Sequence, residues 1–468
     1  MSSYKYLLKN VGLFTISEFA SKFITFFMLP LYTYYLSTEE YAVIDLIQVT
    51  QNLIIPVVTL SIADAVLRFA FDRNENTGEI FSLGVLVTAA GSVLVVIGCF
   101  AGSGNEVIGR YLWWIIGSII IVMFSTLLSN FARAIDKVQA ITVSSIITTA
   151  IVASANVLMV AYLKMGVAGY LSALVLGNAF KCLYLAIACR TWEYFQFRSL
   201  RKDTLARMLK YSLPLIPNSM FWWVNSSINK YFLTGLTTLA QVGLYSAASK
   251  IPAMGNTISN VFNSAWRMSA IKEVDSEDKN SFFEMIYELY TFTLAVIVLG
   301  ITVSVKLLAL ILFSKDFYDA WIVVPFLMLG FYFDSNNAFI GNLFVGAKIT
   351  KVLFTTTVVG AIANVVLNAA LIPPFGIVGA AIATTFSNMV IFFVRRKRAK
   401  EWLQFSPSLK KQGPVVVVMV ILALAAFSNT IWLYILFPFA MAVVLFIYRQ
   451  QVGFLYQQGM KILGKVKK

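Results

Sequence analysis

Apolar residues fill this chain in long, nearly unbroken stretches that are separated by short polar segments. Each stretch runs for roughly 20 residues or more, the length that crosses a hydrocarbon core of about 30 Å as a helix. The pattern therefore predicts an all-α, polytopic membrane protein with fourteen transmembrane helices. The predicted spans are 10–36, 39–70, 80–103, 109–133, 137–163, 166–190, 206–232, 239–270, 283–313, 318–345, 349–372, 376–395, 412–428 and 430–449.

The composition supports this assignment. Of the 468 residues, 59% are hydrophobic and only 13% are charged, whereas about 25% of a soluble domain is charged. Cys99, Cys182 and Cys189 all lie in predicted spans and have no metal-type spacing, so we interpret them as small core residues. The first span carries Glu18 and Lys22 and is too long for a cleavable signal sequence, so we expect it in the mature protein.

The basic residues predict the orientation in the membrane. If the N-terminus is cytoplasmic, about 29 of the 37 Lys and Arg residues fall on the cytoplasmic side. Both termini are therefore expected in the cytoplasm. The formal net charge of +15 is spread over many loops rather than gathered on a folded module, which argues against a nucleic-acid partner. Topology and anionic membrane lipids account for most of it.

A repeated pattern divides the chain into related halves. Gly166-Val-Ala-Gly169 returns as Gly376-Ile-Val-Gly379, and Glu40-Tyr-Ala42 is echoed by Gln241-Val-Gly243. Several echoes in one order indicate duplication. Six spans per half give both halves the same orientation, so they form a parallel repeat with a pseudo-two-fold axis along the membrane normal. In transporters built this way, substrate binds between the halves.

The domains follow from this repeat. We predict an N-lobe at 1–205, a C-lobe at 206–400, and a further part at 401–468 that holds two additional helices and a basic cytoplasmic tail. The aromatic and basic stretch 190–203 is typical of an amphipathic segment on the inner membrane face.

Polar side chains inside the spans mark the candidate site, because a central charge costs about 2.5–3.5 kcal/mol and such groups usually face a bundle interior or a wet cavity. In span 8, Asn256, Asn260, Asn263 and Arg267 follow i, i+4, i+7 and i+11, which places them on one helical stripe. Spans 1, 2, 7 and 8 carry the richest polar faces. The predicted substrate-cavity residues are Glu18, Lys22, Asp45, Asn52, Arg68, Asn218, Asn225, Asn229, Lys250, Asn256, Asn260, Asn263 and Arg267.

These residues also have simpler interpretations. A membrane Asn often only bonds a neighbouring helix, for about 0.6 kcal/mol. Glu18 and Lys22 can neutralise each other, and Asp64 with Arg68 can be a plain surface pair. Lys22 and Lys250 are the better candidates for contacting an anion.

No catalytic or metal-binding residue is predicted, and no cofactor is expected. Coupling to H⁺ or Na⁺ remains open. The chain has no histidine, so proton coupling would use Glu18, Asp45 or Asp64.

Several motifs carry a family resemblance. Tyr4-Lys-Tyr-Leu-Leu-Lys-Asn10, Leu29-Pro-Leu-Tyr-Thr33, Ser37-Thr-Glu-Glu-Tyr41 and Gly376-Ile-Val-Gly-Ala-Ala-Ile-Ala-Thr384 resemble the polysaccharide-repeat flippases of the multidrug/oligosaccharidyl-lipid/polysaccharide (MOP) exporter superfamily. The resemblance implies the MOP exporter fold, with spans 1, 2, 7 and 8 lining a central cavity. It also implies alternating-access transport of an undecaprenyl-pyrophosphate-linked oligosaccharide to the outer leaflet of a bacterial cytoplasmic membrane. The added terminal helices resemble those of lipid-II-type flippases.

The expected partners are the lipid-linked oligosaccharide, membrane lipids, and the polymerase and glycosyltransferases of the same pathway, and we expect a monomer. A multidrug cation antiporter of the same fold is one alternative, although it would need a cavity dominated by acids and aromatic residues. A membrane glycosyltransferase or polymerase is the other. Its acids would be Glu39 and Glu40, which the charge bias of outer loops explains more simply.

Overall fold

The structure is a computed structural model that describes residues 22–72, 74–196, 200–273, 279–347, 349–428, 430–454 and 457. Within these ranges every regular element is a helix, which confirms the predicted all-α fold class. The chain divides into two compact units, Met1–Ser227 and Ile228–Lys468. The lobe borders predicted at residues 205 and 400 come from the sequence repeat, whereas these units are defined by their internal packing, so the lobe borders stay predictions.

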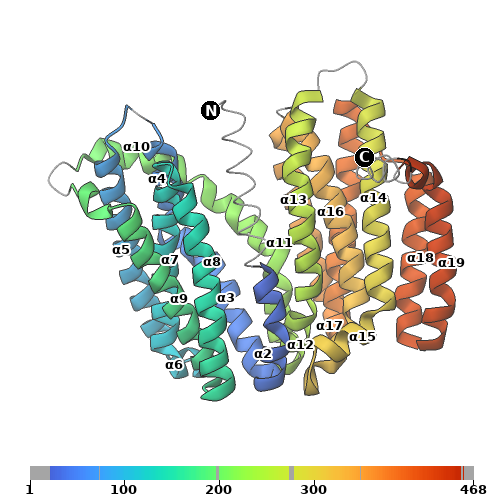
Figure 1. The fold of residues 1–468 in the computed structure, drawn as a ribbon, viewed down its shortest axis with the longest axis horizontal. Coiled ribbons are helices and arrows are strands. Elements are labelled where there is room, and N and C mark those ends of the chain that lie inside the picture. The colour runs from blue at the N-terminus through green and yellow to red at the C-terminus, as the bar shows by residue number, and fades with distance from the viewer. Residues whose placement is uncertain are drawn as a thin grey trace, which may run out of the picture. The chain divides into compact units, whose positions relative to one another are not determined.

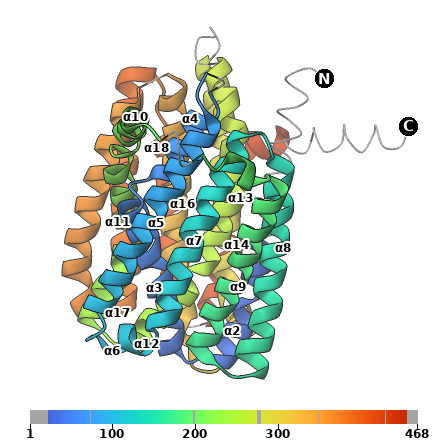
Figure 2. The ribbon, with the colours of Figure 1, turned by 90° about the vertical axis from the view of Figure 1, so that its left-hand side faces the viewer.

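Helices of the first unit pack as a bundle, in which α7 lies between α5 and α9 and α8 lies against α9 (Figure 2). Its elements are α2 (Leu29–Tyr35), α3 (Thr38–Val58), α4 (Ile62–Ala70), α5 (Thr77–Ala101), α6 (Glu106–Arg110), α7 (Leu112–Ala134), α8 (Val138–Asn156), the π-helix η1 (Val157–Tyr162), α9 (Gly166–Ala188), the 3₁₀ helix η2 (Thr191–Tyr194) and α10 (Lys202–Ser212). Helix α11 (Leu215–Leu236) contains the border between the units.

The predicted span 39–70 is two helices. Ser37 and Glu40 form a capping box that starts α3. The chain then turns at Leu60 and Ser61, whose φ angles of 52° and 51° lie in the left-handed region and cannot continue an α-helix. Helix α4 begins directly after this break. The apolar pattern continues through the break, so hydropathy alone could not reveal it.

The predicted span 206–232 is also divided, because its first residues belong to the separate amphipathic helix α10. This helix packs on α4 and α5 of the first unit. Arg207 donates to both carboxylate oxygens of Glu75, at 2.5 and 3.0 Å, and the bond raises the pKa of Arg207. The ring of Tyr211 meets Phe69 edge-on, with centroids 6.0 Å apart. These contacts hold α10 to the first unit, and α11 starts only after it.

Helices of the second unit include a long antiparallel pair, α18 and α19, which packs on α14 (Figure 1). Its elements are α12 (Leu239–Ala248), α13 (Lys250–Glu273), α14 (Lys279–Val303), α15 (Val305–Leu312), the 3₁₀ helix η3 (Lys315–Ile322), α16 (Val324–Gly346), α17 (Thr350–Leu403), α18 (Leu409–Ser428) and α19 (Thr430–Ile447). Helix α16 packs against α13, α14 and α17 and is the most central element of this unit.

Helix α17 covers the two predicted spans 349–372 and 376–395, which meet at a kink. Gly376 has φ 54° and ψ −131°, a conformation that side-chain-bearing residues strongly avoid. Pro373 and Pro374 precede it and weaken the helical hydrogen bonding there.

Eight helices in the described residues are long and apolar enough to cross a membrane, and α16 together with η3, bent by 52°, gives a ninth. One of the eight is α17, which contains two predicted spans. These helices confirm a multi-pass membrane protein. The count of fourteen and the cytoplasmic location of both termini stay predictions.

The two units repeat one local arrangement, which supports the predicted duplication. In each unit, a glycine with a φ angle of 54° is the first residue of a Gly-x-x-Gly motif, at Gly166 and at Gly376. A Cβ atom on Gly166 would lie 2.4 Å from Oε1 of Glu40, and one on Gly376 would lie 3.1 Å from Oε1 of Gln241. Glu40 and Gln241 occupy the same position, three residues after the N-caps Ser37 and Thr238.

Candidate functional site

The two lysines expected to contact an anion differ in their surroundings. Lys22 is exposed, whereas Lys250 is half-buried at the first residue of α13. Glu18, the predicted partner of Lys22, lies outside the described residues.

The polar face of α3 is used mainly for packing within the first unit. Gln48 Nε2 donates to the hydroxyl of Tyr170 on α9 at 2.6 Å, and Gln51 Nε2 donates to Ser118 Oγ on α7 at 2.7 Å. Asp45 is buried on the same helix, with 4% of its surface exposed. Asn52 is exposed, so its amide is more accessible than those of Gln48 and Gln51 on the same helix.

Asp64 and Arg68 on α4 do not form the ion pair that their spacing suggested. Both residues are exposed, and within the described parts of the chain the recorded partner of Asp64 is Asn130 on α7, whose Nδ2 donates to Oδ1 at 3.3 Å. Asp64 therefore bonds a side chain of the neighbouring helix α7 rather than Arg68 on the next turn of α4.

The three asparagines of span 7 lie in different environments along α11. Asn218 is exposed, and Asn225 is half-buried with a buried Oδ1 that has no hydrogen-bond partner in the described structure. Asn229 is buried, with 3% of its surface exposed. The face of α11 therefore changes from exposed to buried along its length.

Asn229 belongs to an amide and hydroxyl network inside the second unit. Its Nδ2 donates to Tyr245 OH at 3.0 Å and to Thr384 Oγ1 at 2.6 Å, and its Oδ1 accepts from Asn368 Nδ2 at 2.7 Å. Asn368 Nδ2 also donates to Oδ1 of Asn364 at 2.8 Å. These bonds join α11, α12 and both parts of α17, which is the packing role that an intramembrane Asn commonly has.

The stripe on α13 meets α16 at one end. Asn263 Oδ1 accepts from Asn342 Nδ2 at 3.1 Å, and Arg267 Nε donates to Asn342 Oδ1 at 3.0 Å. Asn263 is buried and Arg267 is exposed, while Asn260 is exposed and Asn256 is half-buried. The last two residues of the stripe therefore bond α16, and Asn260 is the exposed amide of the stripe.

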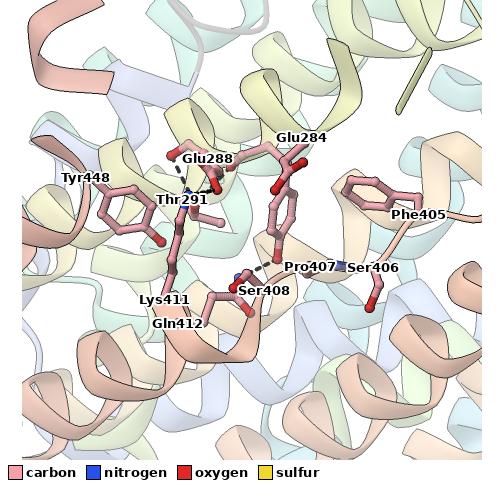
Figure 3. A pocket seen from close by; sticks show the side chains of 11 residues that line it. Glu284, Glu288, Thr291, Phe405, Ser406, Pro407, Ser408, Lys411, Gln412 and Tyr448 are labelled. Atoms are coloured by element: carbon pink, nitrogen blue, oxygen red, sulfur yellow. Dashed lines mark hydrogen bonds and ion pairs between the residues drawn. The ribbon is translucent and has the colours of Figure 1, made fainter. Parts of the chain in front are cut away.

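A polar cluster joins α14 to the ends of α18 and α19 (Figure 3). Glu288 on α14 is buried and accepts from Lys411 through Oε1 and from Gln451 through Oε2. Beside it, Gln412 Nε2 donates to the hydroxyl of Tyr287 at 2.5 Å. Tyr287 and Glu288 of α14 thus bond the first turn of α18 and the segment that follows α19.

Among the described residues, no three His, Cys, Asp or Glu side chains lie close enough together to hold a metal ion. The contacts of the polar faces on α3, α11 and α13 are made mainly by amide and hydroxyl groups. Such groups bind sugar hydroxyls, phosphates or each other.

The sequence profile of the family described as "Polysaccharide biosynthesis protein" matches residues 7–267, more than half of the chain. The chain belongs to this family. No curated protein sequence matches it.

Two solved structures share the fold of this chain. A lipid II flippase, MurJ, in an inward closed conformation is 15% identical, with a TM-score of 0.72 that covers 96% of this chain and 99% of the flippase. A multidrug resistance MATE family transporter of the MOP superfamily, in an inward-facing conformation, is 14% identical, with a TM-score of 0.64 over 84% of this chain and 96% of the transporter. At these identities the likeness shows the fold alone, and it confirms the expected MOP fold.

Two further charges lie inside the second unit. Arg395, the last residue of the predicted span 376–395, is 9% exposed and donates from Nε to Thr356 Oγ1 at 3.0 Å and from Nη1 to the carbonyl of Asn337 at 2.7 Å. Half-buried Asp334 on α16 lies within electrostatic range of it. The run Asp334-Ser-Asn-Asn337 inside a predicted span was the signal for Asp334, whereas Arg395 stood at a span end and looked like a loop charge.

Proposed function

We propose that this protein is a flippase that moves an undecaprenyl-pyrophosphate-linked oligosaccharide from the inner to the outer leaflet of a bacterial cytoplasmic membrane by alternating access. The translocated unit would serve the biosynthesis of a cell-surface polysaccharide. The glycosyltransferases and polymerase of that pathway are the expected partners, and we propose a monomer.

The observation that carries the proposal is the joint evidence of the polysaccharide biosynthesis profile and a flippase fold match along almost the whole chain. The MATE match covers 84% of the chain and the flippase match 96%. The difference is close in size to the stretch 409–468, which holds α18 and α19. Since the similar structures are transporters, transport is favoured over glycosyl transfer.

The chemistry of the substrate explains why a protein is needed. A pyrophosphate and its sugars cannot cross hydrocarbon without polar partners, while a polyprenyl tail can remain in the lipid. In this proposal Lys22 and Lys250 attract the phosphates. The accessible amides of Asn52, Asn218 and Asn260 bind sugar hydroxyls. The amide of Asn229 serves to hold its helix in place.

The energy source is a separate part of the proposal. A buried carboxylate can take up a proton or a cation in one conformation and release it in another. Of the three predicted coupling residues, Asp45 is the buried one that the structure describes, and Asp64 is exposed and bonded to Asn130. We therefore propose Asp45 as the residue to test first for H⁺ or Na⁺ coupling.

The decisive experiment measures lipid-linked oligosaccharide in each leaflet. Depletion of the protein should trap the lipid-linked unit on the inner leaflet. The double variant Lys22→Ala/Lys250→Ala should reduce the outer-leaflet pool more than Lys22→Arg/Lys250→Arg, which keeps both charges. Normal outer-leaflet accumulation in the double alanine variant would overturn the role of these lysines, and normal accumulation after depletion would overturn the flippase function.

The second candidate function is a drug or cation antiporter, which the likeness to MATE structures favours. It predicts export of fluorescent organic cations from vesicles, with loss of export in Asp45→Asn. The flippase proposal predicts no such export.

A further inference from the structure

A cavity of about 440 Å³ opens where α14, α18 and the C-terminal end of α19 meet. All its lining residues belong to the second unit. Its walls include Glu284 and Met285 from α14, Lys411 from α18, and Gln450 and Phe454 from the residues that follow α19. A cavity of this size is large enough for a lipid headgroup, since small-molecule pockets start at about 300 Å³.

Buried Glu288 holds the positive charge of the cavity in place. Its Oε1 accepts from Lys411 and its Oε2 accepts from Gln451, so the carboxylate fixes both side chains. The Lys411 ammonium has three hydrogens, one of which goes to Glu288. The lysine side chain remains 35% exposed and lines the cavity, so its other hydrogens can bind a phosphate there.

A second acidic side chain, Glu284, lines the same cavity. Glu284 is exposed, lies one turn before Glu288 on α14, and has no hydrogen bond or ion pair within the part of the chain that the structure describes. The cavity therefore presents a carboxylate and an ammonium that are held by different helices. With Glu288 included, its net charge is about −1, which disfavours an anionic ligand.

The remaining wall is apolar. Met285, which is 37% exposed, lies with Leu289 and Phe454 along the cavity. These residues lie where apolar helices give way to Lys, Glu and Gln side chains, a transition that marks the headgroup region of a bilayer. A ligand here would have a charged head and an apolar part.

We propose that this cavity binds a zwitterionic phospholipid with a primary ammonium, of the phosphatidylethanolamine type. The phosphate contacts Lys411 and the amide of Gln450, the ammonium contacts Glu284, and the acyl chains run along Met285, Leu289 and Phe454. A bound lipid of this kind would connect α14 with the added helices α18 and α19 from the outside, as Glu288 connects them from within.

The test is a lipid-binding titration of the purified, delipidated full chain by native mass spectrometry. The probes are phosphatidylethanolamine, phosphatidylcholine and phosphatidylglycerol with identical acyl chains. Wild type should bind phosphatidylethanolamine roughly tenfold more tightly than phosphatidylcholine, whose methylated head cannot donate a hydrogen bond, the factor expected for one charge-assisted bond.

Glu284→Gln should reduce this preference to about onefold, since it removes the charge and leaves the Glu288 contacts intact. The matched control is Glu401→Gln, an exposed residue of the same unit that pairs with Arg398 outside the cavity. It should keep the wild-type preference.

Three results would overturn the proposal: equal or tighter binding of phosphatidylglycerol, an unchanged preference in Glu284→Gln, or binding of soluble phosphoethanolamine as tight as that of phosphatidylethanolamine, which would mean that the lipid tail plays no part. Because the readout is binding, it is independent of the flippase function.

Discussion

Alanine substitution of the two left-handed glycines should have unequal effects on the two halves of the protein. Gly166 and Gly376 share a φ of 54°. A side chain in this conformation adds strain of about 1–3 kcal/mol. Strain alone would therefore destabilise Gly166→Ala and Gly376→Ala by similar amounts.

The neighbouring side chains make the difference. The new methyl group of Gly166→Ala would lie 2.4 Å from Oε1 of Glu40, against 3.1 Å from Oε1 of Gln241 for Gly376→Ala. Glu40 cannot move away freely, because its Oε2 accepts the backbone N–H of Ser37 at 3.0 Å. The Gln241 oxygen has no hydrogen-bond partner in the described structure, so its displacement costs little. Loss of a helix cap costs about 0.5–2 kcal/mol.

We therefore expect Gly166→Ala to lower the free energy of unfolding by about 2–5 kcal/mol and Gly376→Ala by about 1–3 kcal/mol. The assay is reversible unfolding by SDS in detergent micelles, followed by tryptophan fluorescence. The control is Gly98→Ala, because a Cβ there meets no atom within 4 Å. It should be neutral or slightly stabilising.

A double-variant cycle tests the reason. Glu40→Ala should destabilise wild type by about 1 kcal/mol and the Gly166→Ala variant by almost nothing, since the cap is already lost there. The reasoning is refuted if Gly376→Ala is at least as damaging as Gly166→Ala, or if Glu40→Ala has the same cost in both backgrounds.

Three other experiments test the packing of the second unit. Asn229→Ala and Asn368→Ala should each lower the free energy of unfolding by about 1–3 kcal/mol. The double variant should lose less than the sum of the two single losses, because the two residues share one hydrogen bond; additive losses would contradict a shared network. Arg395→Met should lower the free energy of unfolding by about 3–5 kcal/mol, since it leaves the acceptors on Thr356 and Asn337 without a donor and Asp334 without a nearby positive charge; an unchanged value would contradict the burial of this charge. Trp266→Ala should cost about 3–5 kcal/mol through the cavity that it leaves, because only 3% of Trp266 is exposed; a loss below about 1 kcal/mol would contradict its place in the core.

The long helices were predictable because hydropathy reports how much of a helix can enter lipid. The spans 80–103 and 166–190 correspond to α5 and α9 within a few residues. The break at Leu60 and Ser61 was not predictable in this way, since both residues are compatible with a helix and the apolar pattern continues past them. The amphipathic α10 was missed for the related reason that its apolar face adjoins the next apolar stretch.

The candidate site was predictable only as helical faces. The period of the α13 stripe places Asn263 and Arg267 together, but the partner Asn342 comes from α16, and no local pattern identifies a partner on another helix. The same holds for Glu288, whose two partners follow it by more than one hundred residues. Spacing within one helix defines a face, whereas the function of that face depends on the helices that cover it.

The burial of Arg395 has a consequence for how the protein is made. A charge at the end of a span is an orientation signal while the helix enters the membrane, yet here the same charge ends inside the second unit. Its final partners come from α16 and from the first part of α17, so its burial must wait until these helices have associated. Correct insertion and correct assembly thus place different demands on one side chain at different times. Replacing its partner Thr356 with valine should leave the membrane topology intact and yield a correctly inserted but weakly assembled protein, which topology reporters and protease resistance can distinguish.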